Sequence, residues 1–107
     1  MSTTGIGKGS SEPDHDRWLV IDGRRWRRTD PVLPDDVVQQ LKSHLGRARS
    51  LVGVAGRAGD EAAKEAARER VSIAKHGLGE RGPRWWDSDP IERIARARAA
   101  LEQLDDG

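Results

Sequence analysis

The fold of this chain is decided between Val71 and Pro90, where the sequence reads VSIAKHGLGERGPRWWDSDP. The stretch predicts the end of one helix, a break at glycines, a Gly-Pro turn, two adjacent tryptophans and the start of another helix. The chain has four tryptophans and no Phe or Tyr, so Trp85 and Trp86 supply a large share of its bulky apolar side chains. We expect this pair to anchor the fold first and to form a binding surface only second.

Two helices are predicted ahead of this stretch. Apolar residues recur every three or four positions over residues 35–54 and again over 60–77, which indicates two amphipathic helices. The glycine-rich segment 53–59 predicts the turn between them, and the alanines of the second helix favour an antiparallel pair. Gly46, inside the first helix, either weakens that helix by about 1 kcal/mol or marks a close approach to a neighbouring helix.

A third helix is predicted after the tryptophans. Asp89 is a helix-capping residue, Pro90 suits the first helical position, and Glu92 completes a capping box. An apolar stripe then continues to Leu104. We therefore expect a helix over residues 90–104.

A β-hairpin is predicted over residues 17–29. Asp22-Gly23 supplies the positive φ angles of a two-residue type I′ turn between two short runs with strand-forming residues. With the turn at these residues, Leu19 pairs with Trp26, and the face of the hairpin that carries both side chains can pack on a helix. Arg27 falls on the opposite face, where it could stack on Trp18.

The sequence thus predicts an α+β fold that is mostly helical. A single small domain over 16–104 contains the hairpin packed on the helix pair, the Trp-Trp loop and the C-terminal helix. Residues 1–15 are rich in Gly, Ser, Thr and charge and are expected to form a disordered tail, and 105–107 a short C-terminal tail.

Composition limits the class of protein. A chain of 107 residues that is 35% hydrophobic and 35% charged builds only a small core. The absence of cysteine excludes disulfides and thiolate chemistry. No apolar run is long enough for a membrane span, and no apolar segment near the start is typical of a signal peptide. We expect a cytoplasmic protein that does not bind membranes.

Charge is unevenly distributed although the net charge is only +1. Residues 24–28 read RRWRR, and arginines that neutralise phosphates beside a tryptophan that can stack on a base are typical of nucleic-acid binding. The alternative is that these arginines only solvate the outer face of a small sheet. The candidate nucleic-acid-binding residues are Arg24, Arg25, Arg27, Arg28, Lys42, Arg47 and Arg49.

A second class of function is a protein-interaction or dimerisation adaptor. Arg84, Trp85 and Trp86 lie in one loop, and tryptophan and arginine are enriched at interface hot spots. The third helix either completes the core or seats a second protomer, because a chain this poor in large apolar residues favours dimerisation. The alternative for the loop is structural, with one tryptophan in the core and the other half exposed.

No catalytic or metal chemistry is predicted. The chain contains none of the common nucleophile, zinc-protease or nucleotide-loop motifs, so we expect no enzyme and no cofactor. His44 and His76 could approach each other across the helix pair, but two histidines without an acidic or thiolate ligand make a poor zinc site.

Two segments carry a resemblance to a known family. These are GRRWRRTDP at 23–31 and AKHGLGERGPRWW at 74–86, although family members often have Ala at the position of Gly77. With their spacing they resemble a family of small uncharacterised bacterial proteins from high-GC genomes, some labelled "biopolymer transporter Tol". The resemblance covers about residues 17–87. It implies one compact module and no known activity, and the membrane span, signal and propeller repeat that the label would suggest are not found in these residues.

Overall fold

The structure, a computed structural model, describes residues 17–106. The elements are β2 (Trp18–Ile21), β3 (Arg24–Arg27), α2 (Asp35–Ala58), α3 (Glu61–Gly77), the 3-10 turn η1 (Trp85–Asp87) and α4 (Pro90–Asp106). The predicted fold class, α+β and mostly helical, is confirmed. The tail predicted over 1–15 lies outside the described residues.

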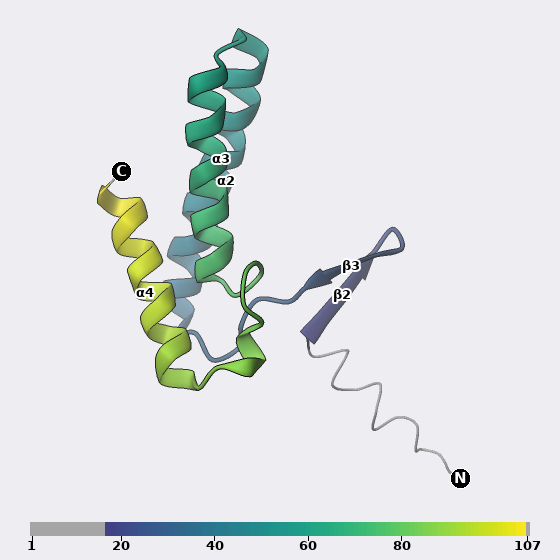
Figure 1. The fold of residues 1–107 in the computed structure, drawn as a ribbon, viewed down its shortest axis with the longest axis vertical. Helices are drawn as coiled ribbons and strands as arrows, with labels where there is room; N and C mark the ends of the chain where they lie inside the picture. Colours follow the sequence, from purple (N-terminus) through teal and green to yellow (C-terminus); the bar gives the residue numbers. More distant parts are fainter. Residues whose placement is uncertain (1–16, 107) are drawn as a thin grey trace.

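The helices α2 and α3 form an antiparallel pair that stands upright in Figure 1. Helix α4 lies against one end of this pair, and the β-hairpin projects on the side away from α4 (Figure 1). The far half of the helix pair therefore extends beyond the rest of the molecule.

Helix α2 is longer than predicted. The predicted end at residue 54 is wrong, because the helix continues through Gly53 and Gly56 to Ala58. A glycine inside a helix costs only about 1 kcal/mol, and the buried Ala55 continues the apolar stripe that packs on α3. Helix α4 also runs to Asp106, so two residues of the predicted C-terminal tail are helical.

Both helices of the pair end in the same hydrogen-bonded motif. The amide of Asp60 donates to the carbonyl of Ala55, and the amide of Glu80 donates to the carbonyl of Lys75. In each case the residue before the donor is a left-handed glycine, Gly59 at φ 71° and Gly79 at φ 79°. This is the Schellman arrangement, which satisfies carbonyls that a helix end leaves without partners.

The predicted helix starts are confirmed. The Asp60 side chain accepts a hydrogen bond from the amide of Ala63 at 3.0 Å, and the Asp89 side chain accepts one from the amide of Glu92 at 2.9 Å. These short side chains satisfy amides that the first turn leaves without partners.

The core lies at the end of the helix pair where α4 packs. Val37, Leu41, Leu78 and Leu104 are its largest fully buried side chains. Toward the other end, the buried side chains of the pair are only alanines such as Ala55 and Ala67. Within residues 17–106, no helix combines the length and the apolar character that crossing a bilayer demands.

A buried charge pair joins the hairpin connector to α4. The carboxylate of Asp30 is 3% exposed and accepts two hydrogen bonds from the Arg93 guanidinium, one of them from Nε at 2.9 Å. Its Oδ1 also accepts the amide of Val32, and its own amide donates to the carbonyl of Leu78. Asp30 therefore connects three segments that are distant in sequence.

Candidate nucleic-acid interface

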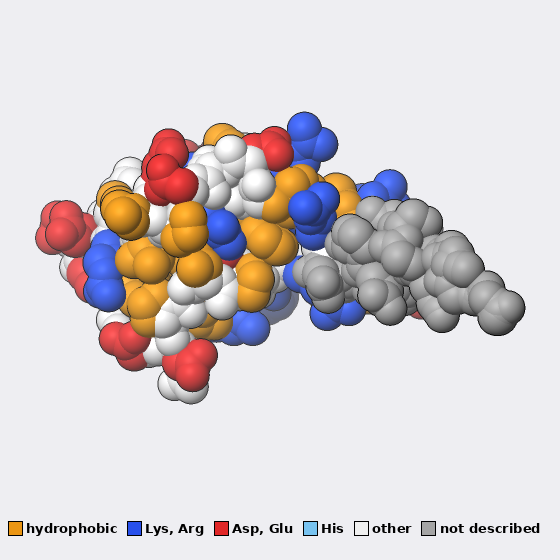
Figure 2. Space-filling view, turned by 90° about the horizontal axis from the view of Figure 1, so that it is seen from below, with side chains coloured by type: hydrophobic (Ala, Val, Ile, Leu, Met, Phe, Trp, Pro, Cys, Tyr) orange, Lys and Arg blue, Asp and Glu red, His pale blue; other side chains and the backbone are white. Residues whose placement is uncertain are grey.

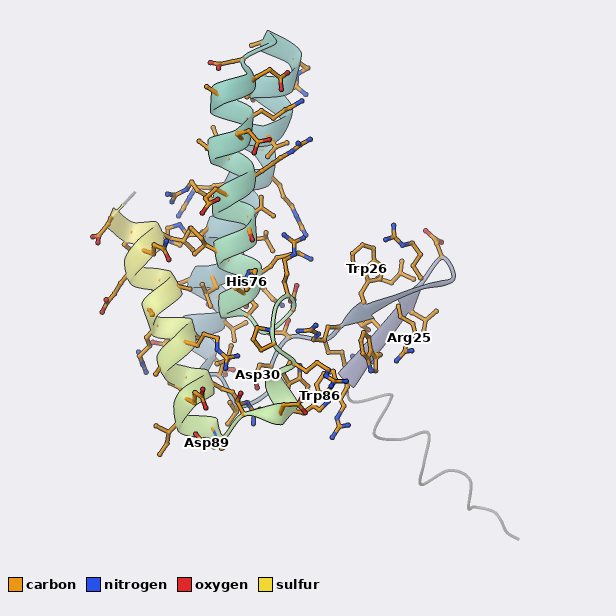
Figure 3. All side chains as sticks on the ribbon, viewed as in Figure 1. Arg25, Trp26, Asp30, His76, Trp86 and Asp89 are labelled. Carbon is orange, nitrogen blue, oxygen red and sulfur yellow. The ribbon has the colours of Figure 1, made fainter. Side chains whose placement is uncertain are left out.

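Strands β2 and β3 pair in the register that the sequence predicts, with Leu19 opposite Trp26. Asp22 and Gly23 form the turn with φ angles of 52° and 79°, both positive as a type I′ turn requires. Because side chains alternate along a strand, Trp26 and Arg25 project from opposite sides of the ribbon (Figure 3).

The hairpin face that carries Trp26 is only partly covered. Trp26 is 39% exposed, and its neighbours Leu19 and Ile21 are also exposed. Between this face and the helices lies a hollow of about 310 Å³, here called the Trp26 hollow. It is lined by Leu19, Ile21, Trp26, Arg27, Thr29, Arg49, Lys75 and Glu80. The indole ring is therefore accessible rather than sealed in a core.

Two cations lie over the Trp26 ring, and a third lines the same hollow. The Arg24 guanidinium lies 4.8 Å from the ring centroid and the Lys75 ammonium 5.5 Å from it, both within cation–π range. Arg49 lines the same hollow from α2. An exposed aromatic face with flanking positive charges is the combination that single-stranded nucleic-acid sites use.

Glu80 is the acidic residue of the Trp26 hollow. Its Oε1 lies 3.7 Å from the Lys75 ammonium, and its Oε2 accepts the Thr29 hydroxyl at 2.6 Å. Both side chains of the Lys75–Glu80 pair are mostly buried, so the pair holds the turn after α3 against that helix. The Thr29 hydrogen bond then ties the same turn to the segment leaving β3. With Arg27, Arg49 and Lys75 against Glu80, the lining keeps a positive balance.

The other face of the hairpin is occupied by aromatic packing. Arg25 stacks on Trp18 at 4.2 Å from the ring centroid, which is the contact that the sequence suggested for Arg27. Trp18 in turn meets Trp86 edge to face, with ring centroids 5.7 Å apart. The structure therefore separates Arg25 from the Trp26 hollow.

Arg27 holds the fold together. Its Nη1 donates to the carbonyls of Gly79, Gly82 and Pro83 at 3.3, 2.9 and 3.1 Å. Its Nε is buried and has no hydrogen-bond partner within residues 17–106. These contacts tie β3 to the turn after α3, so Arg27 positions the hairpin. The carbonyl of Arg28 has a similar role, since it accepts the Trp85 indole N–H at 3.0 Å.

The candidate residues of α2 divide between two sides of the helix. Arg47 contacts Ser43 and His44, and His44 contacts Asp105 of α4 at 2.8 Å. Arg49 instead faces the hairpin, and the exposed Lys42 lies two helical turns before it on the same side. Of the predicted residues, the structure thus places Arg24 over the Trp26 ring, and Arg27 and Arg49 in the lining of the Trp26 hollow.

A second hollow adjoins the first and was not predicted. It measures about 390 Å³ and is lined by Arg49, Val52, Arg68, Val71 and Arg81. We call it the arginine hollow. Arg49 lines both hollows, so the two are neighbours. The spacing of Arg68 and Lys75, seven residues apart on α3, is the sequence signal that could have placed both on this side.

The loop proposed as a partner site mostly serves the fold. Trp85 is 7% exposed and lies under the guanidinium of Arg93 at 5.1 Å. Trp86 is half-buried between Trp85 and Trp18. Arg84 is exposed and pairs with Asp87 at 3.2 Å. One tryptophan is thus buried and the other is not, as the structural alternative predicts.

The two helical histidines have separate partners. His44 pairs with Asp105, and His76 Nδ1 lies 2.8 Å from the Ser72 carbonyl on its own helix. In the part of the chain that the structure describes, no group of three or more potential ligands is placed to hold a metal ion.

Comparison with known proteins adds no family. Scans of this chain against protein-family models, curated proteins and solved structures each found no match. The resemblance at residues 23–31 and 74–86 therefore stays a prediction.

Proposed function

We propose that this protein is a non-catalytic nucleic-acid-binding module. The observation that carries the proposal is the exposed Trp26 ring, which lines a hollow with Arg49, while Arg24 and Lys75 lie over the ring itself. Base stacking on an aromatic side chain contributes about 1–3 kcal/mol per base, and arginine and lysine neutralise the phosphates on either side.

The contacts of the hairpin arginines support this proposal. Among the described residues, Arg24 and Arg25 lie over aromatic rings, and Arg27 donates to carbonyl oxygens. A guanidinium over a ring keeps its charge and N–H groups available for a phosphate, whereas a carboxylate partner would neutralise it. We expect phosphate contacts from Arg24, which lies over the Trp26 ring, and from Arg49 of α2, which lines the Trp26 hollow.

The test is binding of a labelled mixed-sequence DNA or RNA oligonucleotide, measured by fluorescence anisotropy across a salt series. We expect the logarithm of the association constant to fall linearly with the logarithm of the salt concentration. Trp26→Leu should weaken it by about tenfold through lost stacking, and Arg24→Gln/Arg49→Gln should flatten the salt dependence.

The matched control is Arg57→Gln/Arg98→Gln. It removes the same charge from exposed residues that line neither hollow. It should bind nearly as the native protein does, and circular dichroism should show all variants folded. If the native protein binds no oligonucleotide even at low ionic strength, or if both hollow variants bind normally, the proposed function is wrong.

Self-association through the start of α4 is the second candidate function. Ile91 is 82% exposed in the first turn of α4, at the lower end of the molecule. On the face seen from below, apolar side chains gather between acidic ones at the edges (Figure 2). Such a surface favours a partner or a second copy of the chain.

Sedimentation equilibrium over a range of protein concentrations tests this alternative. A dimer should dissociate in Ile91→Asp and persist in Arg98→Gln, since only the first places a charge in the apolar surface. A native protein that stays monomeric at high concentration would exclude it.

A further inference from the structure

Three arginines from separate segments converge on the arginine hollow. Arg49 comes from α2, Arg68 from α3 and Arg81 from the turn that follows α3. The turn reaches this place because the Schellman motif at Gly79 reverses the chain at the end of α3. Val52 and Val71 also line the hollow and make part of its lining apolar.

The charge in this hollow is only weakly offset. Arg68 lies 3.8 Å from Glu65, and both side chains are more than half exposed. Such an exposed ion pair contributes little to stability, so Arg68 can exchange Glu65 for another anion. Three guanidinium groups around one hollow repel one another, and a multiply charged oxyanion relieves that repulsion. Phosphate fits best, because guanidinium groups form paired hydrogen bonds with its oxygens.

The two hollows share Arg49 and so lie next to each other. We propose that the arginine hollow is the phosphate subsite of a single-stranded nucleic acid whose neighbouring base stacks on Trp26. This inference rests on the proposed function. The apolar valines suit the sugar of the same nucleotide, and Arg49 lies where the phosphate of one nucleotide meets the base of the next.

Geometry favours a single strand over a duplex. The Trp26 face of the ribbon is directed toward the helix pair (Figure 3), and the hollow lies between the two. Bases in a duplex are stacked on their neighbours and cannot present a face to Trp26, whereas a single strand can turn its bases outward. The hairpin here forms one wall of a groove rather than a ribbon inserted into a duplex.

The experiment uses the full chain and a labelled oligothymidylate of about eight nucleotides, with a duplex of the same length as a second probe. Anisotropy gives affinity and its salt dependence, and quenching of intrinsic tryptophan fluorescence reports stacking on Trp26, provided that it disappears in Trp26→Leu. We expect tighter binding of the single strand than of the duplex.

The variant that isolates the subsite is Arg68→Gln/Arg81→Gln, with Arg57→Gln/Arg98→Gln as the charge-matched control. Losing one phosphate contact should weaken binding about tenfold and reduce the salt slope by about 0.7, while the quenching at saturation remains. The control should keep the native slope.

The outcomes separate the subsite from the proposed function. If Trp26→Leu weakens binding and Arg68→Gln/Arg81→Gln leaves affinity and slope unchanged, the module binds nucleic acid but the phosphate subsite is wrong. Equal or tighter binding of the duplex overturns the single-strand assignment. No binding of either probe at low salt overturns both proposals.

Discussion

Asp30 is a charged residue placed in the interior, and its partners explain how it is tolerated. The Arg93 guanidinium approaches it from α4 with two hydrogen bonds, and Asp30 also bonds to the amides of Val32 and Leu33 and to the carbonyl of Leu78. The hydrogen bonds that Arg93 donates to the Asp30 carboxylate raise the pKa of Arg93 above its ordinary value, although burial opposes this. A raised pKa contributes stability that is lost only when pH rises through it, so Arg93 stays charged across the neutral range.

We expect Asp30→Ala to destabilise the protein by about 3–5 kcal/mol, because it leaves the mostly buried Arg93 guanidinium without its partner. Urea unfolding followed by tryptophan fluorescence gives the free energy of unfolding. Asp87→Ala is the control, since its pair with Arg84 is exposed and should contribute about 1 kcal/mol or less. Equal losses in the two variants would contradict the assignment of Asp30 as a central structural contact.

At the scale of the helices, two glycines have opposite roles. A Cβ added at Gly77 would lie 2.7 Å from the Cβ of Ala100 and 3.1 Å from Leu41, so α3 ends against both α2 and α4. A Cβ added at Gly46 meets nothing within 4 Å. The close helix approach that the sequence left open for Gly46 therefore occurs at Gly77.

Gly77→Ala should lower the free energy of unfolding by about 1–3 kcal/mol, because α4 must shift to admit the methyl group. Gly46→Ala should raise it by about 0.5–1 kcal/mol, because alanine favours helix and the site has room. Chemical denaturation gives the free energy of unfolding of each variant, and both substitutions lie in the same helix pair. A stabilising Gly77→Ala would show that α4 adjusts its position without cost.

Across residues 17–106, the two ends of the helix pair differ in what packs on them: α4 lies against one end, and the other end extends beyond the rest of the molecule (Figure 1). The large buried side chains lie where α4 meets the helix pair, whereas the far end of the pair is held together mainly by alanines. Stability should therefore decrease along the pair toward Gly59.

Native-state hydrogen exchange tests this gradient. Amides of residues 52–66 should exchange at least about tenfold faster than those near Leu41 and Ala74, because opening the far end exposes little apolar surface. Exchange measured by NMR at several low urea concentrations distinguishes local opening from global unfolding. Uniform protection along both helices would mean that the far end is covered, for example by a second copy of the chain.

Local features of this protein follow from the sequence alone. The hairpin register, the caps Asp60 and Asp89 and the burial of one tryptophan of the Trp85–Trp86 pair were predictable, because turn and cap chemistry acts within a few residues. The C-terminal end of α2 was not predictable in this way. Glycine is only a weak signal for a helix end when buried neighbours continue the apolar stripe of the helix.

The candidate site was decided by tertiary structure. Sequence identified an arginine-rich hairpin but could not distinguish Arg27, which bonds to carbonyls more than fifty positions away, from Arg24, which flanks an exposed ring. It also missed Lys75, Arg68 and Arg81, which meet the hairpin side only after α3 and its turn are placed. The charge on each side chain is fixed by its chemistry, whereas its exposure and neighbours depend on contacts between segments far apart in the chain.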